Sequence, residues 1–150
     1  ILRCLVGSEM CIRDSTYIRE HYQLRAILES ACAGLAAEEG VDISGIRDSY
    51  EESKAALGKG DYSQYASQNR DFHSEIWAAA GNKKMENMIA ELWNGLSMGN
   101  MVTEQEYAKI SIEEHGRIMD AIAAGDGERA KKEMYAHIMR SRDDMLTYYQ

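Results

Sequence analysis

The sequence contains no proline and no long apolar run. Because proline breaks the interior of a helix, its absence permits long, uninterrupted helices. The lack of an apolar stretch of about 20 residues argues against a membrane-spanning helix, so we expect no membrane partner. The 150 residues are enough for one domain with a hydrophobic core and leave little room for a second domain.

Cysteine and positive charge are also scarce. The three cysteines, Cys4, Cys11 and Cys32, have no paired spacing, which argues against a disulfide scaffold or a CxxC zinc site and favours the reducing cytoplasm. The formal net charge is -8, and no stripe of Lys or Arg stands out. Since an anionic surface repels nucleic acid, we do not expect this chain alone to bind DNA.

The beginning of the chain differs from the rest. Residues 6–15 read Val-Gly-Ser-Glu-Met-Cys-Ile-Arg-Asp-Ser and resemble the in-frame translation of a transposase-type sequencing adapter. The alternative is a natural linker, which would have to explain an apolar start without helical or strand periodicity. We therefore expect residues 1–15 to be non-native, residues 16–150 to form the domain, and the natural sequence before Thr16 to be missing.

The remaining chain predicts an all-α fold. Apolar residues recur at three- and four-residue steps, and no segment alternates in the manner of a half-buried strand. In the first helix this stripe comprises Leu24, Ile27, Leu28, Ala31 and Leu35. Short loops between long amphipathic helices imply an antiparallel bundle of six or seven helices. Six are predicted, at about 17–39, 43–57, 62–80, 83–101, 103–124 and 128–149.

Turn and capping residues define the ends of these helices. Gly81-Asn82 and Gly125-Asp126-Gly127 are turn signals. Asp61 is the expected N-cap of the third helix, and Thr103, which has Glu106 three residues later, is the expected start of the fifth.

Three of the four histidines, His73, His115 and His137, lie on predicted core-facing stripes. His115 is ten residues before Gly125 and His137 is eleven after Asp126, so an antiparallel hairpin places the two at the same height. Counting residues in the same way from His73 over the Gly81-Asn82 turn, and then along the fourth helix into the fifth, leads to His115. His73 is therefore expected at the same height. Asn69 precedes His73 by four residues and therefore shares its helix face.

Three imidazoles and one amide oxygen form a plausible ligand set for a divalent metal. The competing interpretation is that each histidine is an ordinary core residue satisfied by one hydrogen bond. Both interpretations stay open on the residues alone, because the counting requires straight helices and sequential packing.

The chain also resembles a known family over residues 17–148. Its first helix reads Tyr-Gln-Leu-Arg-Ala-Ile-Leu-Glu at 22–29, and its third carries Asn-Arg-Asp-Phe-His-Ser-Glu-Ile at 69–76, followed by Ala-Gly-Asn at 80–82. Glu-His-Gly-Arg-Ile-Met-Asp-Ala-Ile-Ala-Ala-Gly-Asp at 114–126 and Ala-His-Ile at 136–138 complete the pattern. Together these motifs resemble FCD domains, the C-terminal effector-binding domains of the FadR subfamily of GntR-type transcription regulators.

The resemblance implies a divalent metal, zinc first with nickel or manganese as alternatives, bound by Asn69, His73, His115 and His137. Many family members carry Asp where Asn69 stands. Because a neutral amide leaves the full charge of the metal in place, we expect an anionic effector, such as a small carboxylate.

The resemblance also implies that Arg25 faces the effector, where a guanidinium could bind a carboxylate through two hydrogen bonds. A surface Arg25 paired with Glu29 fits the sequence equally well. His21 matches no family ligand, and we expect it on the surface.

The resemblance implies a homodimeric sensor and not an enzyme, and the cysteine usage favours the cytoplasm. A small organic acid, sugar acid or amino-acid-like metabolite would bind near the metal. Its binding would reposition a missing N-terminal winged helix-turn-helix domain on operator DNA. The alternatives are a helical-bundle metalloenzyme and a metal-free structural or effector-binding module. A di-iron bundle needs Glu three residues before its histidines, and this spacing and the His-Glu-x-x-His motif are both absent.

Overall fold

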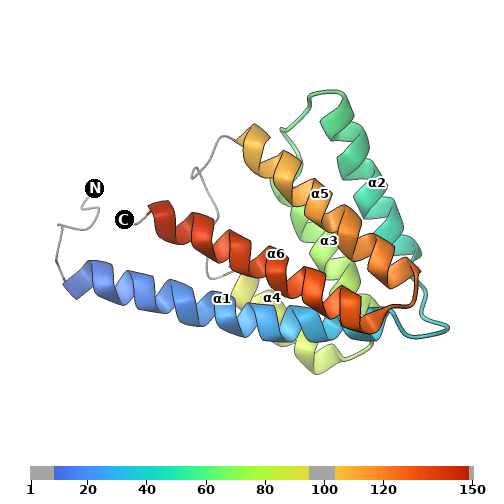
Figure 1. The fold of residues 1–150 in the computed structure, drawn as a ribbon, viewed down its shortest axis with the longest axis horizontal. Coiled ribbons are helices and arrows are strands. Elements are labelled where there is room, and N and C mark those ends of the chain that lie inside the picture. The colour runs from blue at the N-terminus through green and yellow to red at the C-terminus, as the bar shows by residue number, and fades with distance from the viewer. Residues whose placement is uncertain (1–8, 95–103, 149–150) are drawn as a thin grey trace.

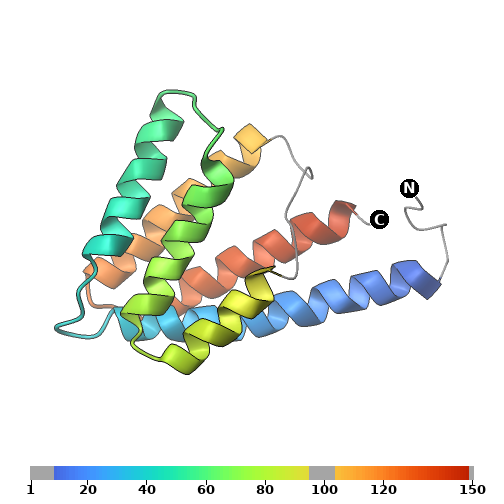
Figure 2. The same ribbon diagram turned by 180° about the vertical axis from the view of Figure 1, so that it is seen from behind.

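The computed structural model describes residues 9–94 and 104–148, and this part of the chain consists of six α-helices without a strand (Figures 1 and 2). The predicted all-α fold is therefore confirmed. Across the described residues, none of the helices is both long and apolar enough to cross a membrane. The helices are α1 (Glu9–Ala36), α2 (Ser44–Gly58), α3 (Tyr65–Ala79), α4 (Lys83–Asn94), α5 (Glu104–Ala123) and α6 (Gly127–Tyr148).

The first and last helices form the long axis of the molecule. α1 and α6 lie side by side and antiparallel, and α6 folds back along α5 (Figure 1). α2 and α3 form a second antiparallel pair, in which α2 packs against α5 and α3 against α1. α4 covers α1 and α3 from the other side (Figure 2). The interior between α1, α3, α5 and α6 is where the site is built.

Two predicted helix starts are wrong. α1 begins at Glu9, within the segment expected to be foreign, and not near Tyr17. α3 begins at Tyr65 because Asp61 does not cap it; the Asp61 carboxylate instead accepts hydrogen bonds from the Ser63 backbone N–H (3.0 Å) and hydroxyl (2.7 Å), which forms a turn before the helix. The expected cap at Thr103 and the end of the fourth predicted helix lie outside the described residues.

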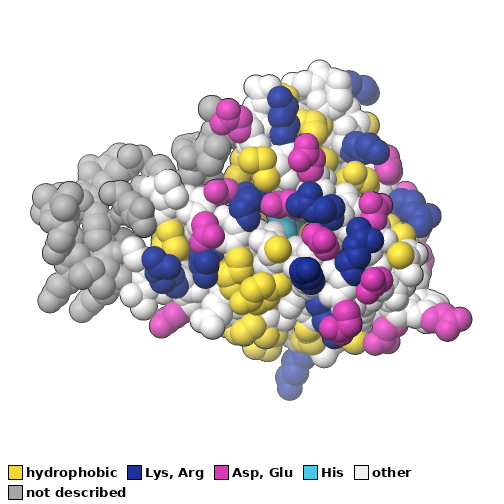
Figure 3. Space-filling model, viewed as in Figure 1, with side chains coloured by type: hydrophobic (Ala, Val, Ile, Leu, Met, Phe, Trp, Pro, Cys, Tyr) yellow, Lys and Arg dark blue, Asp and Glu magenta, His cyan; other side chains and the backbone are white. Residues whose placement is uncertain are grey.

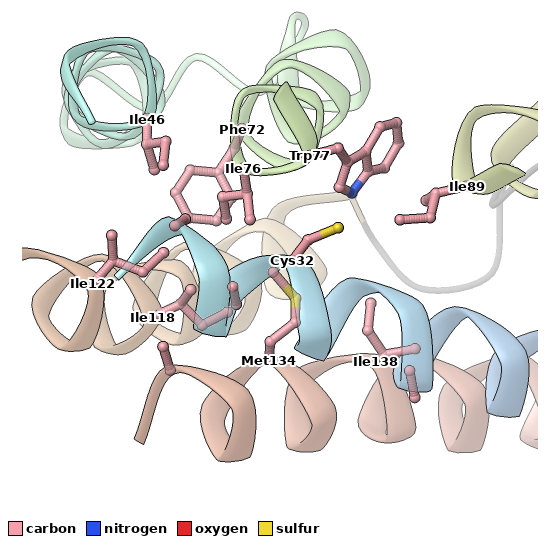
Figure 4. Close-up of a cluster of buried hydrophobic side chains, with 14 of the residues drawn as sticks. Cys32, Ile46, Phe72, Ile76, Trp77, Ile89, Ile118, Ile122, Met134 and Ile138 are labelled. Carbon is pink, nitrogen blue, oxygen red and sulfur yellow. The ribbon is translucent and has the colours of Figure 1, made fainter. Parts of the chain in front are cut away.

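A main apolar core joins the helices, and a smaller second cluster of Tyr65, Ala108 and Ile112 lies between α3 and α5. Figure 4 shows members of the main core meeting between α1, α2, α3, α5 and α6, with Ile89 of α4 at the edge. Phe72 and Ile76 of α3 and Ile118 of α5 are 0% exposed. Burial of aliphatic and aromatic side chains of this size contributes roughly 1.5–3 kcal/mol each, so the core fixes the rotation of every helix that carries a site residue.

Much of the apolar stripe predicted for α1 does not face this core, although Leu28 packs against it. Leu24 is 41% and Ile27 53% exposed, because α1 turns a partly polar face inward. That inward face carries Tyr22, His21, Arg25, Glu29, Ala26 and Cys32. Figure 3 shows apolar side chains gathered on the outer surface over α1 and α6. The apolar pattern alone therefore indicates the wrong face of this helix.

The two predicted turns share one design. Gly81 and Gly125 have φ values of 71° and 70°, a conformation in which a Cβ would be strained, and each closes a helix. The next residue caps the following helix: the Asn82 side-chain oxygen accepts from the Met85 N–H (3.1 Å), and the Asp126 carboxylate from the Arg129 N–H (3.0 Å). The Gly125-Asp126 turn sets the register of α5 against α6.

We expect Asp126→Ala to lower the free energy of unfolding by about 1 kcal/mol, because the first turn of α6 loses its cap. Asp126→Asn keeps a side-chain oxygen at this position and serves as the control, with little change. Urea denaturation followed by circular dichroism measures both. Equal losses for the two variants would contradict a capping role.

Candidate metal centre

Three imidazoles converge in the centre of the bundle. His73 of α3, His115 of α5 and His137 of α6 are at most 3% exposed, and their ring centroids lie 4.8–5.2 Å apart. One ring nitrogen of each histidine lies within 4.8 Å of those of the other two. The histidines that the count placed at one level therefore meet. α5 and α6 pack against each other as the hairpin that the count assumed, and α4 packs against α3 and α1.

The closest approach is between two nitrogens of the same kind. His73 Nε2 and His137 Nε2 are 3.2 Å apart. Their other nitrogens face carboxylates: His73 Nδ1 lies 2.5 Å from Glu29 Oε2 and His137 Nδ1 lies 2.6 Å from Glu114 Oε2. When each Nδ1–H donates to its carboxylate, both Nε2 atoms present lone pairs to each other. Two lone pairs that face each other at this distance can share a metal ion.

The distance agrees with metal coordination. Nitrogens bound at about 2.0–2.1 Å to one metal ion lie about 2.8–3.4 Å apart, from neighbouring octahedral to tetrahedral positions. His115 Nε2 points to the same conclusion, because it is buried without a hydrogen-bond partner. In the described part of the chain, the same is true of Asn69 Oδ1 and of one side-chain atom each of His21, Tyr65 and Ser111. An unpaired buried polar atom is costly, and a metal ion held by the three histidines would satisfy His115 Nε2. The three imidazoles therefore fit a divalent metal, and Asn69 lies one helical turn before His73 on α3.

Burial keeps the imidazoles of His115 and His137 neutral, which is the form that binds metal. Burial lowers the pKa of His115 well below its usual value, and the charges of His137, His73 and Arg140 act in the same direction. Burial also lowers the pKa of His137 to about 4, although the hydrogen bond to Glu114 opposes this shift. Near neutral pH, His115 and His137 therefore carry lone pairs and no charge.

The supporting carboxylates remain ionised inside the protein. Burial alone would raise the pKa of Glu29, but Arg25 and His73 outweigh it through charge and hydrogen bonds and lower that pKa to about 2. Burial would likewise raise the pKa of Glu114, and hydrogen bonds from His137 and Arg140 lower it. A carboxylate that orients a ligating histidine is a common feature of protein metal sites.

Arg25 lies inside the protein and not on its surface. Its Nε and Nη2 each lie 2.8 Å from Glu29 Oε1, so the predicted pairing at i+4 is present but buried, with Arg25 5% exposed. The guanidinium carbon lies 4.4 Å from the centre of the Trp93 ring and 5.3 Å from that of Tyr22. The sequence analysis missed Trp93 as a neighbour of the site.

Three other site residues need explanation. His21, expected on the surface, is 6% exposed and stacks on Tyr17, so that prediction is wrong. It follows the inward face of α1 because it precedes Arg25 by one helical turn. Sequence reasoning considered Glu29 only as the partner of a surface Arg25. It included Glu114 in the family motif at 114–126 without giving it a role.

The chain matches the FCD domain family over residues 20–140, which is most of its length. It belongs to the FCD domain family, as the motifs around the histidines indicated.

A curated relative agrees with this assignment. The chain is 28% identical over 146 residues to the HTH-type transcriptional regulator LutR of Bacillus subtilis (strain 168), in an alignment that covers 89% of this chain and 64% of the relative. The chain therefore spans less than two thirds of that relative's length.

We expect the metal-free protein to lose stability as the pH falls from about 6.5 to about 4. The folded-state pKa of His137 is about 4, below the ordinary 6.5, so over this range the unfolded chain binds a proton that the folded chain does not. The contribution of neutral His137 to the free energy of unfolding is therefore fully present above pH 6.5 and is lost as the pH falls. The lowered pKa of His115 acts in the same direction. Urea denaturation in the presence of a chelator, from pH 8 to 4, measures it.

The control for this pH dependence is His137→Gln, which removes one of the two titrating imidazoles. In this variant the free energy of unfolding should fall less steeply between pH 6.5 and 4. A free energy of unfolding that does not change between pH 6.5 and 4 in the parent protein would contradict the analysis.

Proposed function

We propose that this chain is the effector-sensing domain of a GntR-type transcription regulator. It binds a small carboxylate beside a divalent metal ion. Binding shifts the geometry of the helical bundle, and this shift repositions an N-terminal winged helix-turn-helix domain on operator DNA. Membership of the FCD family and the similarity to an HTH-type regulator support the regulatory role. The pair of facing Nε2 atoms, 3.2 Å apart, is the observation that supports the metal.

The proposed ligands are Asn69, His73, His115 and His137. A donor set of three imidazole nitrogens and one amide oxygen suits zinc, with nickel and manganese as alternatives. When bound, the ion supplies positive charge and open coordination positions. This chain's own residues orient the ligands through Glu29 and Glu114 and exclude water by burial.

Charge balance favours an anionic effector. The three histidines and Asn69 are neutral ligands. The ionised groups around them leave one net negative charge, because Glu29, Glu114 and Asp144 are paired with only two cations, Arg25 and Arg140. Part of the charge of a divalent ion would therefore remain uncompensated in a buried site, where charge interactions are strong. A carboxylate that binds the ion and Arg25 would supply the missing negative charge.

The observations give less support to the rival functions. A metalloenzyme needs a nucleophile or a general base beside the metal, and in the described part of the chain the carboxylates nearest the histidines are engaged by His73, His137, Arg25 and Arg140. A purely structural module would leave the facing Nε2 atoms without a purpose. We therefore assign a binding role to the centre.

The first test is metal content. Elemental analysis of protein purified without chelator or affinity tag should find about one equivalent of divalent metal in the parent and none in His115→Ala/His137→Ala. His21→Ala, which removes a buried histidine outside the trio, is the matched control and should keep the metal.

We propose that residues 1–15 are not part of the domain, so a chain shortened to residues 16–150 should behave like the parent.

A folded parent that binds no zinc, nickel or manganese after addition would contradict the metal site and leave a metal-free pocket around Arg25. Asn69→Asp supplies a further check on the ligand set. It introduces the charged oxygen found in many family members and should bind zinc more tightly than the parent in a chelator competition.

We also propose that the domain forms a homodimer through the exposed apolar surface of α1 and α6. Leu24 and Ile27 are exposed on α1. The Lys131 side chain lies against Gly34 of α1, and Tyr135, which follows one turn later on the same side of α6, is 43% exposed. An apolar surface that spans two adjacent helices favours a second copy of itself, since a two-fold axis brings like surfaces together.

Ile27→Gln should shift the chain from dimer to monomer in light scattering coupled to size exclusion. Ile110→Gln is the control, because Ile110 on α5 is similarly exposed at 46%. A parent that is monomeric at high micromolar concentration would contradict the proposed dimer.

A further inference from the structure

One carboxylate is shared between two parts of the proposed site. Glu29 is 0% exposed, and its two oxygens have different partners. Oε1 lies 2.8 Å from both Nε and Nη2 of Arg25. Oε2 lies 2.5 Å from His73 Nδ1 and accepts a hydrogen bond from Trp77 Nε1 at 3.2 Å. Glu29 thus joins the proposed effector-binding arginine to a proposed metal ligand.

The second carboxylate of the site does not make this connection. Glu114 accepts from His137 Nδ1 (2.6 Å) and from Arg140 Nε and Nη2 (2.7–2.9 Å). Arg140 is also held by Asp144 at 2.5 Å, and its side chain is 21% exposed. Glu114 supports one histidine as Glu29 does, but its arginine is at the edge of the site. The chain therefore contains a built-in comparison between two similar carboxylates.

We propose that Glu29 is a positioning residue that couples metal binding to anion binding. This inference rests on the proposed function and adds how its two ligands affect each other. A metal ion on His73 Nε2 fixes the imidazole with its proton on Nδ1, directed at Glu29. The ionised carboxylate in turn holds Arg25 in one orientation beside Trp93, ready for an anion.

The coupling works in both directions. An anion at Arg25 shares the charge of the guanidinium and weakens its hold on Oε1, so more of the negative charge of Glu29 acts on His73 and the metal. The metal then binds more tightly, and by thermodynamic reciprocity the anion binds more tightly when metal is present. This link adds to any direct bond between anion and metal.

The experiment uses zinc alone as the probe and Arg25→Met as a stand-in for an arginine whose charge an anion has neutralised. Zinc affinity is measured by chelator competition in the parent, Glu29→Gln and Glu114→Gln backgrounds, each with and without Arg25→Met. Each glutamate substitution alone should weaken zinc binding by about 10- to 100-fold, because each removes the carboxylate behind a ligating histidine.

The distinguishing result is the effect of Arg25→Met. It should tighten zinc binding several-fold in the parent and in Glu114→Gln, and clearly less in Glu29→Gln, where the connecting carboxylate is gone. Tryptophan fluorescence provides a second readout, since Trp77 bonds to Glu29 and Trp93 lies 5.0 Å from the His73 ring. The zinc-induced change in emission should differ from the parent in Glu29→Gln more than in Glu114→Gln.

If Glu29→Gln does not fold, Glu29→Asp replaces it, because the shorter carboxylate keeps the charge but cannot reach both partners. An equal effect of Arg25→Met in all backgrounds, with zinc binding intact, would overturn the coupling and leave the proposed function standing. A folded parent that binds no zinc would remove the metal site and the coupling together.

Discussion

Two histidine nitrogens that face each other across 3.2 Å of protein interior are the constraint on which this structure depends. Each is held there from behind by a carboxylate, fully buried in Glu29 and partly buried in Glu114, and each carboxylate is paired with an arginine. Four helices contribute to this arrangement, and none of them can rotate without moving a charged group out of its pair. The apolar core fixes the helices, and the polar centre determines which of their faces turn inward.

This polar centre explains where the sequence was informative and where it was not. The level of His115 and His137 followed from a short-range feature, the Gly125-Asp126 turn, because a hairpin of known turn position has a fixed register. The role of Glu29 depends on contacts with residues 44 and 48 positions away, which no local pattern records. The face of α1 was misjudged for the same reason: pairing between helices buries its charged residues and leaves Leu24 and Ile27 outside.

The boundaries of the elements follow a similar rule. Turns closed by glycine and capped by the next residue were predictable, because their chemistry involves only a few neighbouring residues. The start of α3 was not, since Asp61 had two local options and formed the tight turn with Ser63. The burial of His21 was not predictable for a similar reason. His21 shares a helix face with Arg25, and the inward orientation of that face follows from the contacts of Glu29 with His73 and Trp77 across the bundle.

The placement of Arg25 and Glu29 on α1 has a mechanical consequence. From Glu29 back to Thr16, where the domain is expected to begin, the helix continues without interruption over roughly 20 Å at about 1.5 Å per residue. A tilt of about 5° around the buried ion pair would displace that end by about 2 Å. A rearrangement at one buried carboxylate would therefore be carried along the helix to the segment that precedes the domain.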